Sequence, residues 1–197
     1  VCILALQNLV LLRFLADEIS EGVRLGVDDV TYYWKGVSGA GRQNWNGLTN
    51  VFKANADEIA EATTRIRNHR TTTGNISGGN YGYLEGTVNS ATVDNKMWRS
   101  GTALADEPKI FIAIEVEGTG GKTWLRTTDS EYKMINKLAS DLGGTPGAVK
   151  SNITGELKII SENPYCASCQ GIIQQFNEMF PNVKLILIDG AKYSILQ

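Results

Sequence analysis

Apolar residues recur every three or four positions in four stretches of the chain, a spacing that predicts amphipathic helices. These stretches cover about residues 1–24, 48–67, 129–142 and 167–180. The third stretch runs into Gly143-Gly144 and the fourth into Pro181, and both signals commonly end helices. The last two predicted helices therefore have well-defined ends.

Short runs rich in β-branched and other apolar residues predict five strands. They cover residues 81–88, 109–116, 155–161, 183–188 and 192–196, while residues 71–80 are turn-forming. Asp189-Gly190 offers a tight turn between the last two strands, which we expect to form an antiparallel hairpin. Strands and helices that alternate in this way predict an α/β fold built on a five-stranded mixed sheet.

A glycine-rich segment divides the chain. Residues 36–47 hold four glycines together with serine and asparagine and are expected to form a linker. We therefore predict a helical N-terminal appendage, residues 1–47, and a main domain, residues 48–197. The opening apolar run is too short and too interrupted to span a membrane, and no basic segment with a cleavage site accompanies it. Any secretion signal is expected elsewhere in a longer polypeptide.

Charge and cysteine content narrow the possible functions. A net charge of −2 excludes nucleic-acid binding through a strongly basic surface, so a local patch and base stacking would have to supply it. Three cysteines are too few, and odd in number, for a disulfide framework, and favour a reducing compartment or a metal site. The only histidine, His69, is expected at the surface.

Two motifs carry candidate chemistry, and each stands where a loop gives way to a helix. In the first, Thr128 to Lys133, Asp129 and Glu131 could serve only the helix, since Thr128 and Glu131 have capping-box spacing. The second contains Cys166 and Cys169 one helical turn apart. Such a pair can be half of a zinc site, a redox-active dithiol or two small buried residues.

The two motifs together predict more than either alone. Right-handed crossovers between parallel strands place successive helices on one face of a sheet, with their N-termini at the same edge. Asp129 would then meet Cys166 and Cys169 and form a three-ligand zinc site with an open position for water. Glu131, two residues beyond Asp129, could reach that water and exchange protons with it.

These residues resemble the nucleic-acid and nucleotide deaminase superfamily, whose signature is ligand-x-Glu at one helix start and Pro-Cys-x-x-Cys at the next. More narrowly, residues 126–133, 161–169, 174–176 and 180–181 resemble the deaminase toxin domains of bacterial polymorphic and interbacterial toxin systems. The resemblance covers about residues 48–197. It implies a cytidine-deaminase-like three-layer fold with helices on both faces of the sheet.

The resemblance also implies roles for individual residues. Cys166 and Cys169 would bind zinc, with Asp129 in the remaining ligand position, and Glu131 would be the general acid and base. The substrate would be contacted by Asn80, by Ser100 and by the backbone N–H of Ser130. Asn80 can equally be an ordinary turn residue, and the loop Trp98-Arg99-Ser100 resembles a segment that supplies stacking and a phosphate contact. Asp129 stands where most relatives have His or Cys, and Tyr165 separates Pro164 from Cys166; both depart from the pattern.

The expected function is therefore a zinc-dependent cytosine deaminase that acts on nucleic acid, DNA in the first place. Zinc hydroxide would attack C4, release ammonia and leave uracil. The resemblance implies the toxic domain of a bacterial effector, delivered to the target-cell cytoplasm, with a cognate immunity protein and no membrane partner. Alternatives are an adenine- or RNA-directed deaminase of the same fold, a thiol-disulfide redox protein using Cys166 and Cys169, and a binding module whose zinc is closed by a fourth protein ligand.

Overall fold

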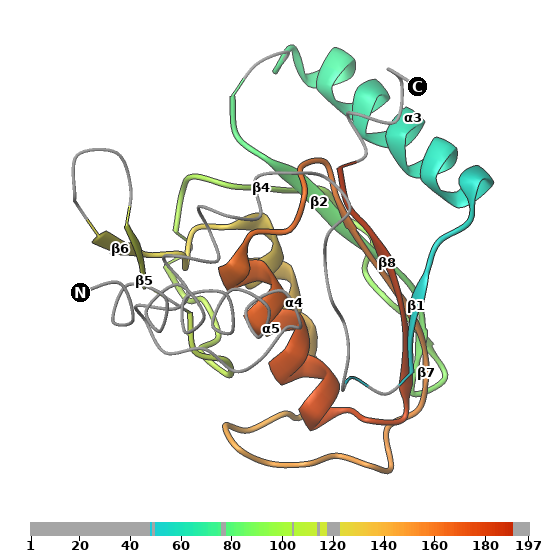
Figure 1. The fold of residues 1–197 in the computed structure, drawn as a ribbon, viewed down its shortest axis with the longest axis vertical. Helices are drawn as coiled ribbons and strands as arrows, with labels where there is room; N and C mark the ends of the chain where they lie inside the picture. The colour runs from blue at the N-terminus through green and yellow to red at the C-terminus, as the bar shows by residue number, and fades with distance from the viewer. Residues whose placement is uncertain are drawn as a thin grey trace, which may run out of the picture.

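The computed structural model describes residue 48 and residues 50–190, apart from residues 76–77, 104, 114 and 118–122. The predicted appendage, residues 1–47, and the predicted last strand, residues 192–196, thus lie outside the described residues. In the described part, a six-stranded mixed sheet separates one helix from two others (Figure 1).

The strands of this sheet come from distant parts of the chain. From one edge to the other they are β1 (Val51–Lys53), β8 (Val183–Ile188), β7 (Gly155–Ser161), β2 (Tyr81–Val88) and β3 (Ala91–Thr92), with β4 (Trp98–Arg99) paired to the start of β2. β1, β8 and β7 are parallel, whereas β2 runs antiparallel to β7. β7 and β8 are joined through α5 (Ala167–Met179), the kind of crossover that parallel neighbours require.

Helices cover both faces of the sheet because its central strands are apolar on both sides. In β7, Leu157 and Ile159 belong to the larger core, which includes α4 (Ser130–Asp141) and α5. Ile160 points the other way, as alternation along a strand requires, and belongs to a smaller core with residues of α3 (Ala56–Thr73). Figure 1 shows α3 on one side of the sheet and α4 and α5 on the other. The predicted α/β fold is confirmed.

The N-terminal part of the main domain differs from the predicted helix over residues 48–67. Residues 51–53 form β1, and α3 begins at Ala56 because Asn55 and Glu58 form a capping box, with two reciprocal bonds of 2.9 Å each. The helix continues into the predicted turn region and ends at Gly74, whose φ of 69° is the left-handed conformation typical of a helix C-terminus.

The strand predicted over residues 109–116 is wrong. Among the described residues of this stretch only β5 (Glu115–Glu117) is a strand, and it pairs antiparallel with β6 (Thr123–Leu125) in a separate two-stranded sheet. Upstream, the N–H groups of Ile110 and Phe111 each donate to Asn136 Oδ1 at 2.9 Å, and that of Ile112 donates to Gln175 Oε1 at 2.9 Å. Side chains of α4 and α5 thus satisfy the backbone that a neighbouring strand was expected to pair.

The predicted C-terminal hairpin is not found in the described residues. Its second strand lies outside them, and β8 has β7 on one side and β1 on the other. Leu185, Ile186 and Leu187 pair with Val51–Lys53 in parallel register, so β1 takes the position beside β8 that an antiparallel partner would need.

The start of β2 and the end of β7 lie at the same end of the sheet, because these strands are antiparallel. Gly82 pairs with Ser161 at this end of the sheet, next to Asn80. α4 and α5 begin nearby, with Asp129 before one helix and Cys166 before the other, although only α5 crosses over between parallel strands as the prediction assumed. None of the described helices combines the length and the apolar character needed to span a membrane.

Candidate metal centre and its pocket

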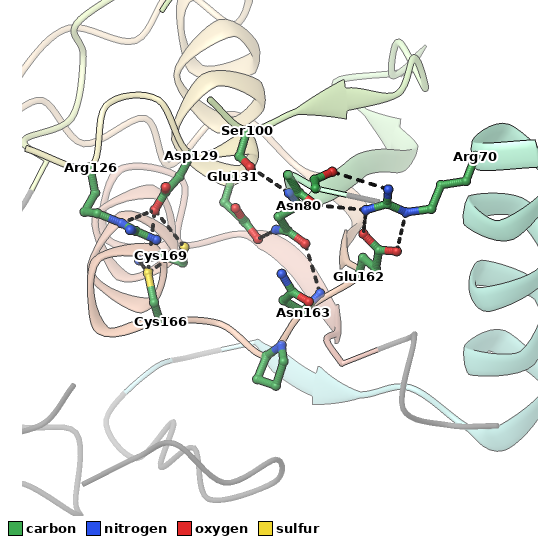
Figure 2. A pocket seen from close by; sticks show the side chains of 13 residues that line it. Arg70, Asn80, Ser100, Arg126, Asp129, Glu131, Glu162, Asn163, Cys166 and Cys169 are labelled. Carbon is green, nitrogen blue, oxygen red and sulfur yellow. Dashed lines mark hydrogen bonds and ion pairs between the residues drawn. The ribbon is translucent and has the colours of Figure 1, made fainter. Parts of the chain in front are cut away.

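Asp129, Cys166 and Cys169 lie together, as Figure 2 shows. Asp129 Oδ2 is 3.6 Å from each sulfur, and the two sulfurs are 3.0 Å apart. That separation exceeds the roughly 2.05 Å of a disulfide bond, so both thiols are free. One ligand atom from each residue lies within 4.8 Å of the others, and no fourth His, Cys, Asp or Glu of the described residues joins this group.

Asp129 occupies the N-cap of α4, yet its side chain makes no capping hydrogen bond. An aspartate in this position normally accepts a bond from an N–H of the first turn. Here it turns toward the two sulfurs and toward Arg126, whose Nε donates to Oδ2 at 2.9 Å. Because α4 begins at Ser130, the capping box considered for Thr128 and Glu131 does not form. Helix capping therefore does not account for Asp129.

The cysteines are held by the first turn of α5. Cys166 is its N-cap, and its sulfur accepts the N–H of Cys169 at 3.3 Å. The hydrogen bond with Cys166, burial, and the charges of Cys166, Glu131 and Asp129 raise the pKa of Cys169 well above its usual value. A divalent cation would relieve this crowding of anionic donors. Two sulfurs and one carboxylate oxygen suit zinc, so the residues fit a zinc site.

Arg126 places a cation beside these donors. Its side chain is 22% exposed and that of Asp129 is 9% exposed, so their ion pair is largely shielded from water. Burial lowers the pKa of the guanidinium, but the charges of Cys166, Asp129 and Cys169 outweigh it, and the pKa is raised. Arg126 therefore stays charged next to the candidate ligands.

Glu131 is almost fully buried next to the candidate metal centre, at 2% exposure. Its Oε1 accepts a bond from Asn80 Nδ2 at 2.8 Å, and its Oε2 accepts one from the Ser130 hydroxyl at 2.9 Å. Burial, followed by the charge of Asp129, raises the pKa of Glu131, while hydrogen bonds from Ser161 and Ser130 oppose the shift. A carboxyl with a raised pKa can both accept and return a proton near neutral pH.

Asn80 is hydrogen-bonded to the start of α4, to the end of β7 and the residues after it, and to the loop that carries Ser100. Besides Glu131, its amide nitrogen lies 3.0 Å from both Ser130 Oγ and Ser161 Oγ, and its Oδ1 accepts the N–H of Asn163 at 3.0 Å. The backbone N–H of Asn80 donates to Ser100 Oγ at 2.6 Å. Asn80 is thus more than a turn residue, because it fixes the carboxylate of Glu131 relative to β2 and β7.

Lys133 fixes the loop that carries Ser100. Lys133 is a buried residue of α4, and its ammonium group donates to the carbonyl oxygens of Arg99 and of Thr102, the latter at 3.0 Å. Burial lowers the pKa of Lys133, and the charges of Glu107, Asp129 and Glu131 act against that effect. The N–H of Gly101 donates to Thr128 O at 3.0 Å, so the loop is also tied to the residue before Asp129.

A cavity of about 610 Å³ opens beside these groups and includes Asp129, Cys166, Cys169, Glu131 and Asn80 in its lining. This volume lies in the range of small-molecule sites, roughly 300–1,000 Å³. Ser100 also lines it, whereas Ser130 is completely buried behind it.

Sequence reasoning assigned no role to Arg70 or Glu162 in the wall of this cavity. Arg70 Nε and Nη2 lie 2.6 Å and 2.5 Å from the two carboxylate oxygens of Glu162 (Figure 2). Arg70 also donates to the carbonyl oxygens of Asn75 and Gly79, both at 2.8 Å. The pair therefore anchors the segment before Asn80 to the residue that follows β7. Only the fold brings together residues so far apart in the sequence.

Comparison with protein families agrees with this geometry. Residues 51–190, more than half of the chain, match the family model described as Toxin-deaminase, the BURPS668_1122 family of deaminases. Comparison with curated proteins and with solved structures gave no match. The matched region contains both helix starts and the whole of the cavity wall described above. The chain therefore belongs to the BURPS668_1122 family of bacterial toxin deaminases, hydrolases of the deaminase superfamily that act on C–N bonds.

Proposed function

We propose that this chain is a zinc-dependent deaminase that converts cytosine to uracil in nucleic acid, with DNA as the expected substrate. The observation that supports this most is the side chain of Asp129, which leaves its helix uncapped and meets two free thiols beside buried Glu131. A group of three protein ligands is typical of catalytic zinc, which keeps a position open, whereas structural zinc normally has four.

Asp129, Cys166 and Cys169 would hold the zinc, and Glu131 would handle the protons. When bound, zinc supplies a water whose lowered pKa makes it a nucleophile toward C4 of cytosine. A carboxylate oxygen of Glu131 accepts a proton and returns it to the departing amino group, so that water and cytosine become uracil and ammonia. Asn80 and Ser130 keep the carboxylate in place through bonds of 2.8 Å and 2.9 Å.

The base would be held by Asn80 and Ser100 in the wall of the same cavity and by the backbone of Ser130 directly behind that wall. The N–H of Ser130 is the first of α4, and such donors have no partner within their own helix, so it can bind the base carbonyl. Asn80 and Ser100 line the cavity and are placed to contact the nucleotide as well. An extruded or single-stranded base suits a cavity of this kind, because leaving the stack costs only a few kcal/mol.

Replacing Asn80 by alanine is expected to reduce turnover about 10- to 100-fold while zinc content stays unchanged. The loss of a hydrogen bond to a carboxylate corresponds to about 1.5–3 kcal/mol, and each 1.4 kcal/mol is about tenfold in rate. Single-turnover kinetics and elemental analysis would measure the two quantities. Asn182→Ala is the matched control, because Asn182 makes an exposed bond to Ser151 O. Equal turnover in the Asn80 and Asn182 variants would contradict the role of Asn80.

Arg99 is the candidate for a phosphate contact. The two arginines that line the cavity, Arg70 and Arg126, already pair with Glu162 and Asp129. Arg99 is exposed and lies against Gly79 of the cavity wall, where an added Cβ would be only 3.0 Å from its Nε. A cation at this point can contact the backbone of a nucleic acid whose base occupies the cavity.

A sequencing assay that detects both C-to-U and A-to-inosine conversion on matched single-stranded DNA, duplex DNA and RNA tests the proposed substrate. We expect conversion on DNA, and Arg99→Gln should weaken it and reduce its salt dependence by about one phosphate contact. Arg67→Gln, which removes an exposed arginine of α3, is the control. Conversion of RNA or of adenine alone would favour the alternative substrates, and conversion of no polynucleotide would contradict the proposal.

The toxic role and the domain division extend this proposal. Membership in a family of bacterial toxin deaminases supports an effector domain that is delivered to a target cell and covered by an immunity protein. The matched region, residues 51–190, supports a deaminase domain over residues 48–197, with residues 1–47 as a separate appendage.

A further inference from the structure

We propose that Arg126 and Asp129 act as one unit, in which the arginine offsets the extra negative charge that an aspartate brings to this metal site. The inference rests on the proposed zinc function. It assigns Arg126 a positioning role, because its contact is with a candidate ligand.

The geometry of the pair supports this role. Arg126 Nε lies 2.9 Å from Asp129 Oδ2, and this is the same oxygen that lies 3.6 Å from each sulfur. The bond holds the carboxylate in the orientation that faces Cys166 and Cys169. Since the side chain of Asp129 makes no capping bond, Arg126 replaces the backbone N–H groups as its partner. Hydrogen bonds of this kind orient metal ligands, and their loss costs about 10- to 100-fold in metal affinity.

The charge balance gives the pair a second purpose. A site of two thiolates and a neutral histidine carries two negative charges, which match a divalent zinc ion. Two thiolates and the carboxylate of Asp129 carry three, and the guanidinium of Arg126 returns the total to two. Because the ion pair is largely buried, its charges are poorly screened by solvent and act strongly on a neighbouring ion.

A double-mutant cycle on the full chain separates this unit from an ordinary surface ion pair. Zinc affinity would be measured by competition with a chromophoric chelator for wild type, Arg126→Gln, Asp129→His and the double variant. Arg126→Gln alone should weaken zinc binding about tenfold, because Asp129 loses its orientation. In the Asp129→His background, Arg126→Gln should tighten zinc binding about tenfold, because it removes a largely buried cation beside the ion after the aspartate has been replaced by a neutral ligand.

Two further substitutions at position 129 control for misfolding of the histidine variant and for a purely steric effect of the substitution. Asp129→Asn also removes the charge, so Arg126→Gln should again tighten zinc binding there if the histidine variant fails to fold. Asp129→Cys keeps an anionic ligand and is the charge-matched control, in which Arg126→Gln should weaken binding as in wild type. Circular dichroism of each variant with and without zinc reports whether it is folded.

The outcomes distinguish this inference from the proposed function. A reversal of sign between charged and neutral residues at position 129 supports the inference. The same effect of Arg126→Gln in every background, with zinc bound by wild type, would overturn the inference alone. A wild-type protein that binds no zinc would overturn the proposed function and the inference with it.

Discussion

Replacing Glu131 by glutamine is expected to lower deamination by at least about a hundredfold while leaving zinc bound. Proton transfer by a positioned side chain contributes about 10²–10⁴-fold to a rate, and the amide cannot perform it. Glutamine keeps the shape of the side chain and can still accept the bond from Asn80 Nδ2. Rates on a polynucleotide and zinc content by elemental analysis are the measurements. Glu131→Ala should give the same pattern.

In the absence of metal, the Glu131→Gln variant should be more stable than wild type at neutral pH. Burial is the main cause that raises the pKa of Glu131, so its ionised form costs folding free energy. The folded-state pKa lies above the unfolded value near 4.5, hence the gain is complete above the folded pKa and shrinks as the pH falls through it. A gain of about 1 kcal/mol would raise Tm by about 2–4 °C for a chain of this size.

Glu178→Gln is the control for both measurements, because Glu178 is exposed near the end of α5, away from the N-terminal end that carries the cysteines. It should leave turnover, zinc content and Tm near their wild-type values. Wild-type turnover in Glu131→Gln on every polynucleotide tested would show that another group transfers the proton.

Replacing Cys169 by alanine is expected to remove zinc, abolish deamination and lower Tm. Wild type is stabilised by the binding free energy of the metal, so a chelator should lower its Tm but leave that of the variant unchanged. Cys166→Ala should behave alike, since both sulfurs lie 3.6 Å from the same oxygen of Asp129. Cys2→Ala is the control, because it removes a thiol outside both motifs.

The cysteine variants also separate the deaminase from a thiol redox protein. A redox dithiol would carry no stoichiometric zinc and would cycle between the free thiols and a disulfide at a defined potential. Purified wild type with a reversible disulfide, no zinc and no chelator effect on Tm would contradict the metal site. One zinc per chain that is lost on either substitution would support it.

Local sequence patterns predicted many of the helices and strands of the fold. β2, β7 and β8 have the predicted bounds, and α4 and α5 begin and end within a residue or two of the helices predicted from apolar spacing. These elements are set by residues near one another in the chain: alternating or helical apolar positions, and stop signals such as Gly143 and Pro181. The family resemblance also came from short motifs, because ligand spacing within one helical turn is a local property.

Pairing between distant segments could not be predicted in the same way. The apolar run at residues 109–113 has strand-like composition, but its N–H groups bond to Asn136 and Gln175 on two helices. Whether such a run meets a strand or a helix depends on which elements lie beside it. β1 escaped prediction for a similar reason, since its three residues are a strand only because β8 lies alongside.

The sequence by itself determined the central strands, the two helices that begin at the site and the identity of the candidate ligands. Only the tertiary structure decided that the side chain of Asp129 faces the two sulfurs and does not cap its helix. It also decided that Asn80 is hydrogen-bonded to Glu131 and that Arg126 and Arg70 form ion pairs with carboxylates. The physical reason is that apolar periodicity records which face of an element is buried. The partners of a buried polar group depend on how those elements come together in space.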